Sequence, residues 1–185
     1  HTLVEAFILV GLVVFLFLGD WRSTIIPAIA VPVSLIGTFM FMQYFGITLN
    51  LITLFALVLA IGIVVDNAIV VIEAVHAKME TKHLSPKKAT KEAMHEVSGA
   101  IIAITFVMAA VFIPVAFMDG IVGMFFNSFA MTVASGIVIS YLVAIMFIPS
   151  IAARVLTAKE NRFYHATEPI LKAIDKAYVW ILKPL

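Results

Sequence analysis

The sequence predicts an all-α membrane protein, a polytopic bundle of transmembrane helices. First, 63% of its 185 residues are hydrophobic and only 12% are charged, whereas soluble domains contain about 45–50% apolar and about 25% charged residues. Second, the apolar residues gather in five runs that each approach or reach the about 20 residues of a membrane-spanning helix. Third, all Lys and Arg residues fall on alternate connections between these runs. The chain contains no cysteine, which excludes disulfides and thiolate metal sites.

The five predicted spans cover roughly residues 3–18, 25–45, 51–72, 100–118 and 129–151. Turn-forming residues separate them, among them Gly19-Asp20, Gly46, Asn50 and Asp119-Gly120. No basic segment or cleavage site precedes the first run, so we do not interpret it as a signal peptide. The chain begins at His1 and enters an apolar run at once, which predicts a partial region of a longer polypeptide.

Two polar segments complete the predicted organisation. A loop at 73–98 is expected to contain a short amphipathic helix with Ser85 as N-cap and Pro86 at its first position. The tail at 152–185 is expected to contain an amphipathic helix that begins at Pro169 and lies in the membrane interface. A sixth span that begins there is the alternative, and three lysines within 172–183 argue against it. The chain thus divides into a five-span part, 1–151, and the tail.

The distribution of basic residues predicts the orientation. Of the 12 Lys and Arg residues, Arg22 lies in the first connection, five lysines lie in 73–98, and the remainder lie in the tail. The connections at 46–50 and 119–128 contain none. Because cytoplasmic loops carry the excess of Lys and Arg, we expect the first span to run inward and the tail to be cytoplasmic.

Asp66 is an acidic residue inside a predicted membrane span. It follows Asn50 by 16 residues, or about 24 Å of helix, and lies about 7 Å to the cytoplasmic side of the span's midpoint. A carboxylate at that depth costs several kcal/mol unless it is paired, hydrated or protonated. This position predicts a proton or ion relay.

Two other interpretations of Asp66 compete with a relay. A structural ion pair is the first, but the five spans contain no Lys, Arg or His, so a partner would have to come from outside this chain. A shifted register that places Asp66 at the membrane interface is the second. Glu73 already marks the inner boundary of the span, which argues against that shift.

The residues around Asp66 suggest supporting roles. Asn67 lies about 100° round the helix and could hydrogen-bond either protonation state of Asp66 without carrying a proton itself. Gly62, one turn earlier on the same face, would let another helix approach closely. Hydroxyl groups inside the later spans could line a polar path for water, although bonding back to their own helix is the alternative. These residues are Thr105, Thr132, Ser135 and Ser140.

The sequence contains no motif that indicates catalysis or the binding of a cofactor, a metal or a nucleic acid. The sequence contains no phosphate-binding loop, nucleophile triad or metal-ligand cluster, so no catalytic residue, cofactor, metal or nucleic-acid partner is predicted. His76, His83 and His95 lie between the third and fourth spans without ligand spacing. We interpret all three as surface residues.

Four segments of the sequence resemble helix motifs of one known family. One is the run Gly62–Glu73, GIVVDNAIVVIE, and the others are Leu16-Phe17-Leu18 with Asp20-Trp21-Arg22, Ile26–Val33 and Phe112–Phe117. The run resembles the fourth-helix signature of the resistance–nodulation–division exporters, more narrowly of their hydrophobe/amphiphile multidrug branch, and the other segments resemble the second, third and fifth helices of that family. The likeness covers nearly the whole chain, as spans two to six of a twelve-span pump.

The resemblance implies a proton/drug antiporter of the bacterial inner membrane rather than an enzyme. Such pumps export hydrophobic or amphiphilic compounds as homotrimers, joined to a periplasmic adaptor and an outer-membrane channel. Asp66 falls on the proton-carrying aspartate of the family. Asn67 falls on a position that is a second aspartate in the best-known drug pumps, and this departure removes one titratable site. The partner lysine, on the tenth span, and the drug-binding periplasmic domains lie outside this chain.

Two alternatives to a drug pump remain open at the level of sequence. One is a related exporter of lipid, metal or protein, although the residues around Asp66 match the drug-pump branch better. The other is a scaffold without transport of its own, which predicts that Asp66 can be replaced without loss of function. The residues that would select a substrate are absent from this chain.

Overall fold

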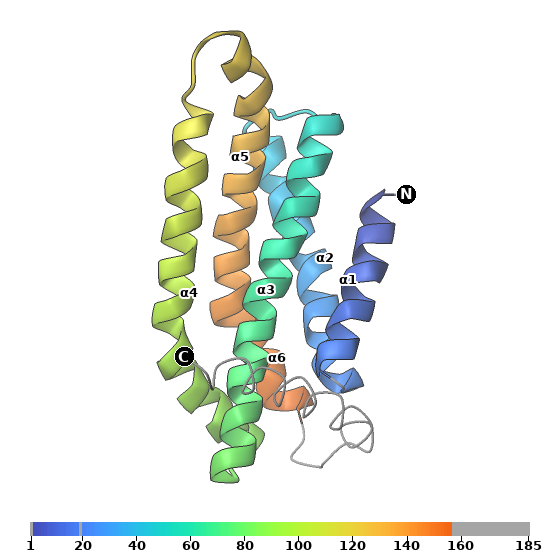
Figure 1. Ribbon diagram of the computed structural model, residues 1–185, viewed down its shortest axis with the longest axis vertical. Helices are drawn as coiled ribbons and strands as arrows, with labels where there is room; N and C mark the ends of the chain where they lie inside the picture. The colour runs from blue at the N-terminus through green and yellow to red at the C-terminus, as the bar shows by residue number, and fades with distance from the viewer. Residues whose placement is uncertain (1, 19, 157–185) are drawn as a thin grey trace, which may run out of the picture.

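The described part of the chain is a bundle of antiparallel and parallel helices. The computed structural model describes residues 2–18 and 20–156. The helices are α1 (Thr2–Leu18), α2 (Trp21–Tyr44), α3 (Leu51–Lys82), α4 (Pro86–Ala116) and α5 (Gly120–Leu142), continued by the π-helical segment η1 (Val143–Phe147) and by α6 (Ile148–Val155). Their paths up and down the bundle are visible in Figure 1. These residues form no strand, and the predicted all-α membrane bundle is confirmed.

Four stretches of the described residues are long and apolar enough to cross a membrane, against five predicted spans. They are α2, α3, α4 and the continuous stretch Phe125–Val155. The first helix, α1, has 17 residues, or about 25 Å, which is less than the about 30 Å of a bilayer's hydrocarbon core. The first predicted span is present as the apolar helix α1, which starts at the second residue of the sequence.

Capping side chains define where α2 and α3 begin. The Asp20 carboxylate accepts hydrogen bonds from the backbone N–H groups of Arg22 and Ser23, at 3.2 and 3.3 Å. Asn50 Oδ1 accepts from the Thr53 N–H at 2.9 Å, and Thr53 Oγ1 accepts from the Asn50 N–H at 2.8 Å. Such reciprocal bonds satisfy N–H groups that have no partner within the first helical turn.

The predicted connection at 73–98 is mostly helical, and the helix expected to begin at Pro86 is present as the first part of the longer helix α4. α3 continues to Lys82, His83 ends it in the left-handed conformation with φ 50°, and α4 begins at Pro86. Ser85 and Pro86 occupy the predicted N-cap and first positions, although the Ser85 side chain makes no capping bond. The apolar run ends at residue 72, whereas the residues that follow are largely polar and remain helical.

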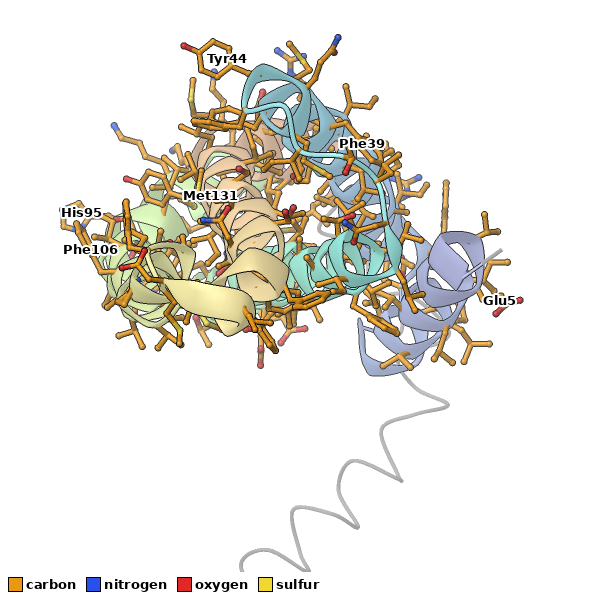
Figure 2. The ribbon with its side chains drawn as sticks, turned by 90° about the horizontal axis from the view of Figure 1, so that it is seen from above. Glu5, Phe39, Tyr44, His95, Phe106 and Met131 are labelled. Carbon is orange, nitrogen blue, oxygen red and sulfur yellow. The ribbon has the colours of Figure 1, made fainter. Side chains whose placement is uncertain are left out.

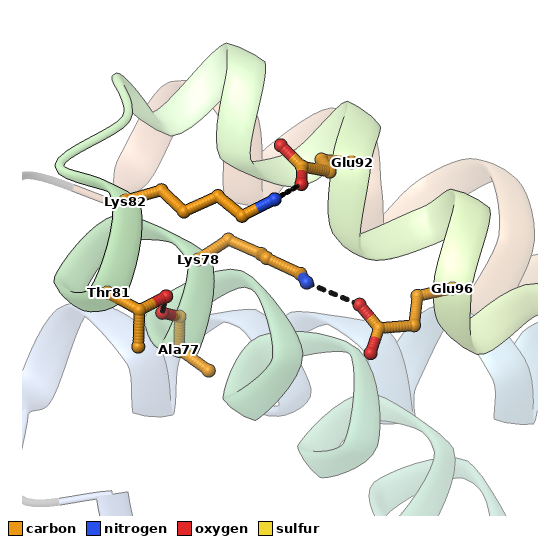
Figure 3. Close-up of polar contacts among 6 residues, drawn as sticks. All are labelled: Ala77, Lys78, Thr81, Lys82, Glu92 and Glu96. Carbon is orange, nitrogen blue, oxygen red and sulfur yellow. Dashed lines mark hydrogen bonds and ion pairs between the residues drawn. The ribbon is translucent and has the colours of Figure 1, made fainter.

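Two ion pairs join the polar ends of α3 and α4. Lys78 pairs with Glu96 at 2.5 Å and Lys82 pairs with Glu92, as Figure 3 shows. The ion pair raises the pKa of Lys78 and lowers the pKa of Glu96, chiefly through the hydrogen bond between the two side chains. The expected loop is thus a helical hairpin with a three-residue turn.

The basic residues gather at one end of the bundle. α2 begins, α3 ends, α4 begins and α6 ends at that end (Figure 1), which brings together Arg22, the five lysines of 73–98 and Arg154. The described connections at the opposite end contain no Lys or Arg. The assignment of the basic end to the cytoplasm stays a prediction, and the amphipathic helix expected after Pro169 lies outside the described residues.

The core is centred on α3. Its inward side chains include Leu57, Ile61 and Ile72, which are 0–2% exposed, and they pack between α2, α4 and α5. Seen along the bundle, Glu5 on α1, Tyr44 at the end of α2 and Phe106 on α4 point outward (Figure 2). This arrangement leaves most of α3 enclosed and one stripe of it open.

Candidate functional site

The open stripe of α3 carries the candidate site. The exposed positions of this helix recur every three or four residues within its apolar part, which places them on one face. They include Phe55, Leu59, Gly62, Asp66 and Glu73. No other described helix covers this stripe, because α2, α4 and α5 pack against the remaining faces of α3.

Asp66 lies in the middle of this stripe, with no polar partner among the described residues. Its carboxylate makes no hydrogen bond or ion pair with residues 2–18 or 20–156. The apolar parts of α2, α4 and α5 contain no acidic or basic side chain that could reach it. A charged group at this depth needs a partner, water or a proton, so the open stripe marks where that partner has to arrive.

Gly62 leaves room next to Asp66. A methyl group built on Gly62 would meet no described atom within 4 Å, which shows that the surface one turn before Asp66 is free of described neighbours. The role expected for Gly62, the close approach of another helix, stays a prediction because such a helix would have to come from outside the described residues.

Asn67 points away from the open stripe. Its side chain is 2% exposed, and its Nδ2 donates a hydrogen bond of 2.9 Å to Ser140 Oγ on α5. The described hydrogen bonds include none between Asn67 and Asp66, and a supporting role of Asn67 at Asp66 stays a prediction. Adjacent helical residues differ by about 100°, and the packing of α3 against α5 decides which of the two faces inward.

Three of the four residues of the predicted polar path bond to their own helices, and the fourth, Ser140, accepts the hydrogen bond from Asn67. Thr105 donates to the Ile101 carbonyl at 2.8 Å, Thr132 to that of Ser128 at 2.7 Å, and Ser135 to that of Met131 at 2.8 Å. Thr132 and Ser135 are buried and Thr105 is partly exposed. These bonds match the alternative for hydroxyl groups in membrane helices, and a role in a water path stays a prediction.

One histidine forms a contact that the sequence interpretation missed. His76 Nε2 lies 2.7 Å from Ser23 Oγ, and Ser23 Oγ donates to the Asp20 carboxylate at 3.0 Å. Because the single hydroxyl proton of Ser23 goes to Asp20, His76 is the donor to Ser23. Burial lowers the pKa of His76, and the negative charges of Asp20 and Glu80 oppose that change.

His76 is therefore not the surface residue that was expected, whereas His83 and His95 are on the surface as predicted. The contact joins residues that are 53 positions apart in the sequence. The only local signal was the pattern Asp20-x-x-Ser23 at the start of α2, which indicates a helix cap and gives no hint of the histidine.

Comparison with known proteins gives a consistent set of relatives. The model of the AcrB/AcrD/AcrF family matches residues 1–185. The toluene efflux pump membrane transporter TtgE of Pseudomonas putida is 47% identical over 165 residues, which are 89% of this chain and 16% of the relative. The solvent-resistant pump membrane transporter SrpB of Pseudomonas putida is 45% identical over the same shares. The multidrug export protein AcrF of Escherichia coli (strain K12) is 46% identical over 155 residues, 84% of this chain and 15% of the relative.

The chain thus spans only about 16% of the length of the first of these relatives. The match includes the open stripe of α3 and the helices that surround it, since the family model extends over every described residue.

Proposed function

The chain belongs to the AcrB/AcrD/AcrF family of resistance–nodulation–division efflux transporters, and on that premise we propose that it is the proton-carrying part of an exporter driven by the proton motive force. It is a multi-pass membrane segment. In this proposal Asp66 takes up and releases the proton, and the chain works as part of a secondary active transporter rather than an enzyme.

The position of Asp66 carries the proposal. It is the one acidic side chain within the apolar part of α3, it lies on the open stripe, and no described residue neutralises it. Ionisable residues inside membrane spans are costly and typically face the interior of the bundle or a water-filled cavity. The stripe is therefore suited to meet the remainder of the same pump, and the family resemblance supplies the expected partner, a lysine of the tenth span.

A transport cycle follows from this pairing. A proton from the periplasm neutralises Asp66, the contact with the lysine weakens, and the helices shift. Release of the proton to the cytoplasm restores the charge pair. One charge that crosses 100 mV supplies about 2.3 kcal/mol, and any pH gradient adds to it. That free energy would drive the periplasmic domains through their drug-binding states.

The substrate class and the assembly rest on the family. The names of the relatives refer to toluene, solvents and multidrug export, which supports hydrophobic or amphiphilic substrates. We expect a homotrimer in the bacterial inner membrane, in contact with lipid and joined to a periplasmic adaptor and an outer-membrane channel.

Drug export by the full-length pump with Asp66→Asn tests the proposal, in cells that lack other pumps. Export should collapse while the protein is still present in the membrane at its normal amount. Glu80→Gln is the matched control, because Glu80 is an exposed acid of the same helix beyond its apolar part. Export that persists in Asp66→Asn would show that Asp66 is structural or that another acid couples transport to protons.

A further inference from the structure

The hydrogen bond between Asn67 and Ser140 has a consequence for the residue next to it. Asn67 is 2% and Ser140 1% exposed, and the bond of 2.9 Å joins two helices across 73 positions of sequence. Because Asp66 and Asn67 are about 100° apart on one helix, a contact that holds Asn67 against α5 also holds Asp66 on the open stripe.

The rest of the seam between α3 and α5 does not fix this rotation equally well. Aliphatic side chains make up a large part of this seam, among them Ile63, Val133 and Ile137, and contacts between them have no directional preference. The helices approach closely at Gly136, where an added methyl carbon would lie 2.6 Å from the Ala60 Cβ. A close, smooth seam permits sliding and rotation, whereas a buried hydrogen bond selects one arrangement.

Loss of the bond would leave a polar group without a partner. Asn67 Nδ2 donates to Ser140, and the only buried side-chain polar atom of the described residues that lacks a hydrogen bond is Ser34 Oγ. An unsatisfied amide in an apolar seam is unfavourable, so α3 would turn or the seam would open to satisfy it. Either response moves Asp66.

We propose that Ser140 is a positioning residue for Asp66: it accepts the buried hydrogen bond from Asn67 and thereby keeps the Asp66 carboxyl on the open stripe of α3. This inference rests on the proposed function of Asp66 and extends it to the regulation of its position. It also gives Asn67 a role that does not require a second titratable carboxyl group at this position. The Asn67 amide donates its hydrogen bond whether Asp66 is protonated or charged.

Two readouts on the full-length pump test the proposal. The first is the pH dependence of drug export. The second is the rate at which dicyclohexylcarbodiimide labels Asp66 in membranes, with Asp66→Asn as the blank. We expect Ser140→Ala to shift the pH profile and to change the labelling rate several-fold, and Ser140→Thr, which keeps a hydroxyl group, to restore both.

Thr38→Val is the matched control. Thr38 also has a buried hydroxyl group, on α2, but this hydroxyl donates to the Ser34 carbonyl of its own helix at 2.9 Å, so its removal should leave both readouts unchanged. Asn67→Ala should reproduce the effect of Ser140→Ala, and the double variant should show no more than either single variant, because all three lack the same bond.

The outcomes separate this inference from the function on which it rests. If Asp66→Asn abolishes export while Ser140→Ala behaves as wild type, the positioning role is wrong and the proton-carrying role stands. The positioning role is equally wrong if Thr38→Val shifts the readouts as much as Ser140→Ala does. If Asp66→Asn still exports, the proposed function is wrong, and carbodiimide labelling alone then reports whether Ser140 fixes the position of the Asp66 carboxyl.

Discussion

The two longest helices, α3 and α4, are alike in length and hydropathy but differ in their surroundings. They have 32 and 31 residues, and both contain a strongly apolar stretch. In that stretch 61% of the residues of α3 are buried, against 11% of those of α4. Hydropathy therefore indicates that both helices suit a membrane but does not indicate which of them is enclosed by protein.

The residue types on the two helices explain the difference. α3 buries small and polar residues against its neighbours, among them Ala56, Ala60 and Asn67, and such residues favour close contact between membrane helices. α4 exposes Phe106 and Val107, which are 72% and 64% exposed and typical of a lipid-facing surface. In contrast to the outer face of α4, the open stripe of α3 contains an aspartate, and we expect it to contact protein rather than lipid.

The largest expected effect comes from placing an acid on the lipid-facing side. Phe106→Asp should cost about 2.5–3.5 kcal/mol of membrane insertion, the cost of an aspartate at the centre of a span. The amount of full-length pump in the membrane fraction measures it. Phe106→Leu is the control. Equal amounts of the two variants would mean that this side of α4 contacts protein or water. The proposed difference between the surroundings of α3 and α4 would then be wrong.

A second comparison uses one glycine from each environment. Gly136→Ala should destabilise the protein by about 1–3 kcal/mol, typical of overpacking, since the new methyl would lie 2.6 Å from the Ala60 Cβ. Gly99→Ala on α4 should instead stabilise it by about 0.5–1 kcal/mol, because an added methyl there meets no described atom within 4 Å.

Thermal unfolding of the purified full-length pump compares the two glycine variants. Opposite signs are the expected result. Changes of the same sign would contradict the close packing of α5 on α3, or show that the side of α4 around Gly99 is covered by another part of the pump.

A smaller effect is expected at the contact between α2 and α3. Burial lowers the pKa of His76 below its ordinary value of 6.5, so the unfolded chain takes up this proton at a higher pH than the folded chain does. The contribution of His76 to stability is therefore full above about pH 6.5 and is lost as the pH falls below it.

His76→Gln should lose less stability than wild type between about pH 8 and about pH 5, the range in which histidine changes its charge. The melting temperature of the full-length pump across that range measures the difference. His95→Gln, at a surface histidine of α4, should follow the wild-type curve. Identical pH curves for His76→Gln and wild type would show that His76 is not buried in the working protein.

The smallest effect is expected where α3 and α4 meet in water. Lys78 and Glu96 form an ion pair at an exposed site, where solvent and salt screen the attraction. Glu96→Gln should therefore change the melting temperature of the full-length pump only slightly, and added salt should remove the difference. A large change that resists salt would show that the hairpin is covered by another part of the protein.

The fold was predictable where local chemistry decides it. The apolar runs predict the helices, the punctuation at Asn50 and Pro86 predicts two of their starts, and the position of Asp66 in the chain places it within a span. The extent of the helices was not predictable in the same way, because the end of an apolar run need not be the end of a helix. Residues 73–82 are largely polar and helical at once.

The residue types of the site were predictable from the sequence, but the directions in which their side chains point were not. The sequence singles out Asp66, yet whether Asp66 or Asn67 faces inward depends on which helices pack against α3. The bonds of Asn67 with Ser140 and of His76 with Ser23 join distant parts of the chain. Without knowledge of these neighbours, the sequence did not indicate a bond between Asn67 and α5, and His76 was expected at the surface.

Asp66 lies on a helix that no proline interrupts. α2 contains Pro27 and Pro32 and α4 contains Pro114, whereas α3 has no proline and keeps its hydrogen-bond ladder along its whole length. Asp66 is the sixteenth of its 32 residues, about 22 Å from Leu51 and about 24 Å from Lys82. Because the helix is uninterrupted, we expect a displacement at this one carboxyl to move both ends of α3 together.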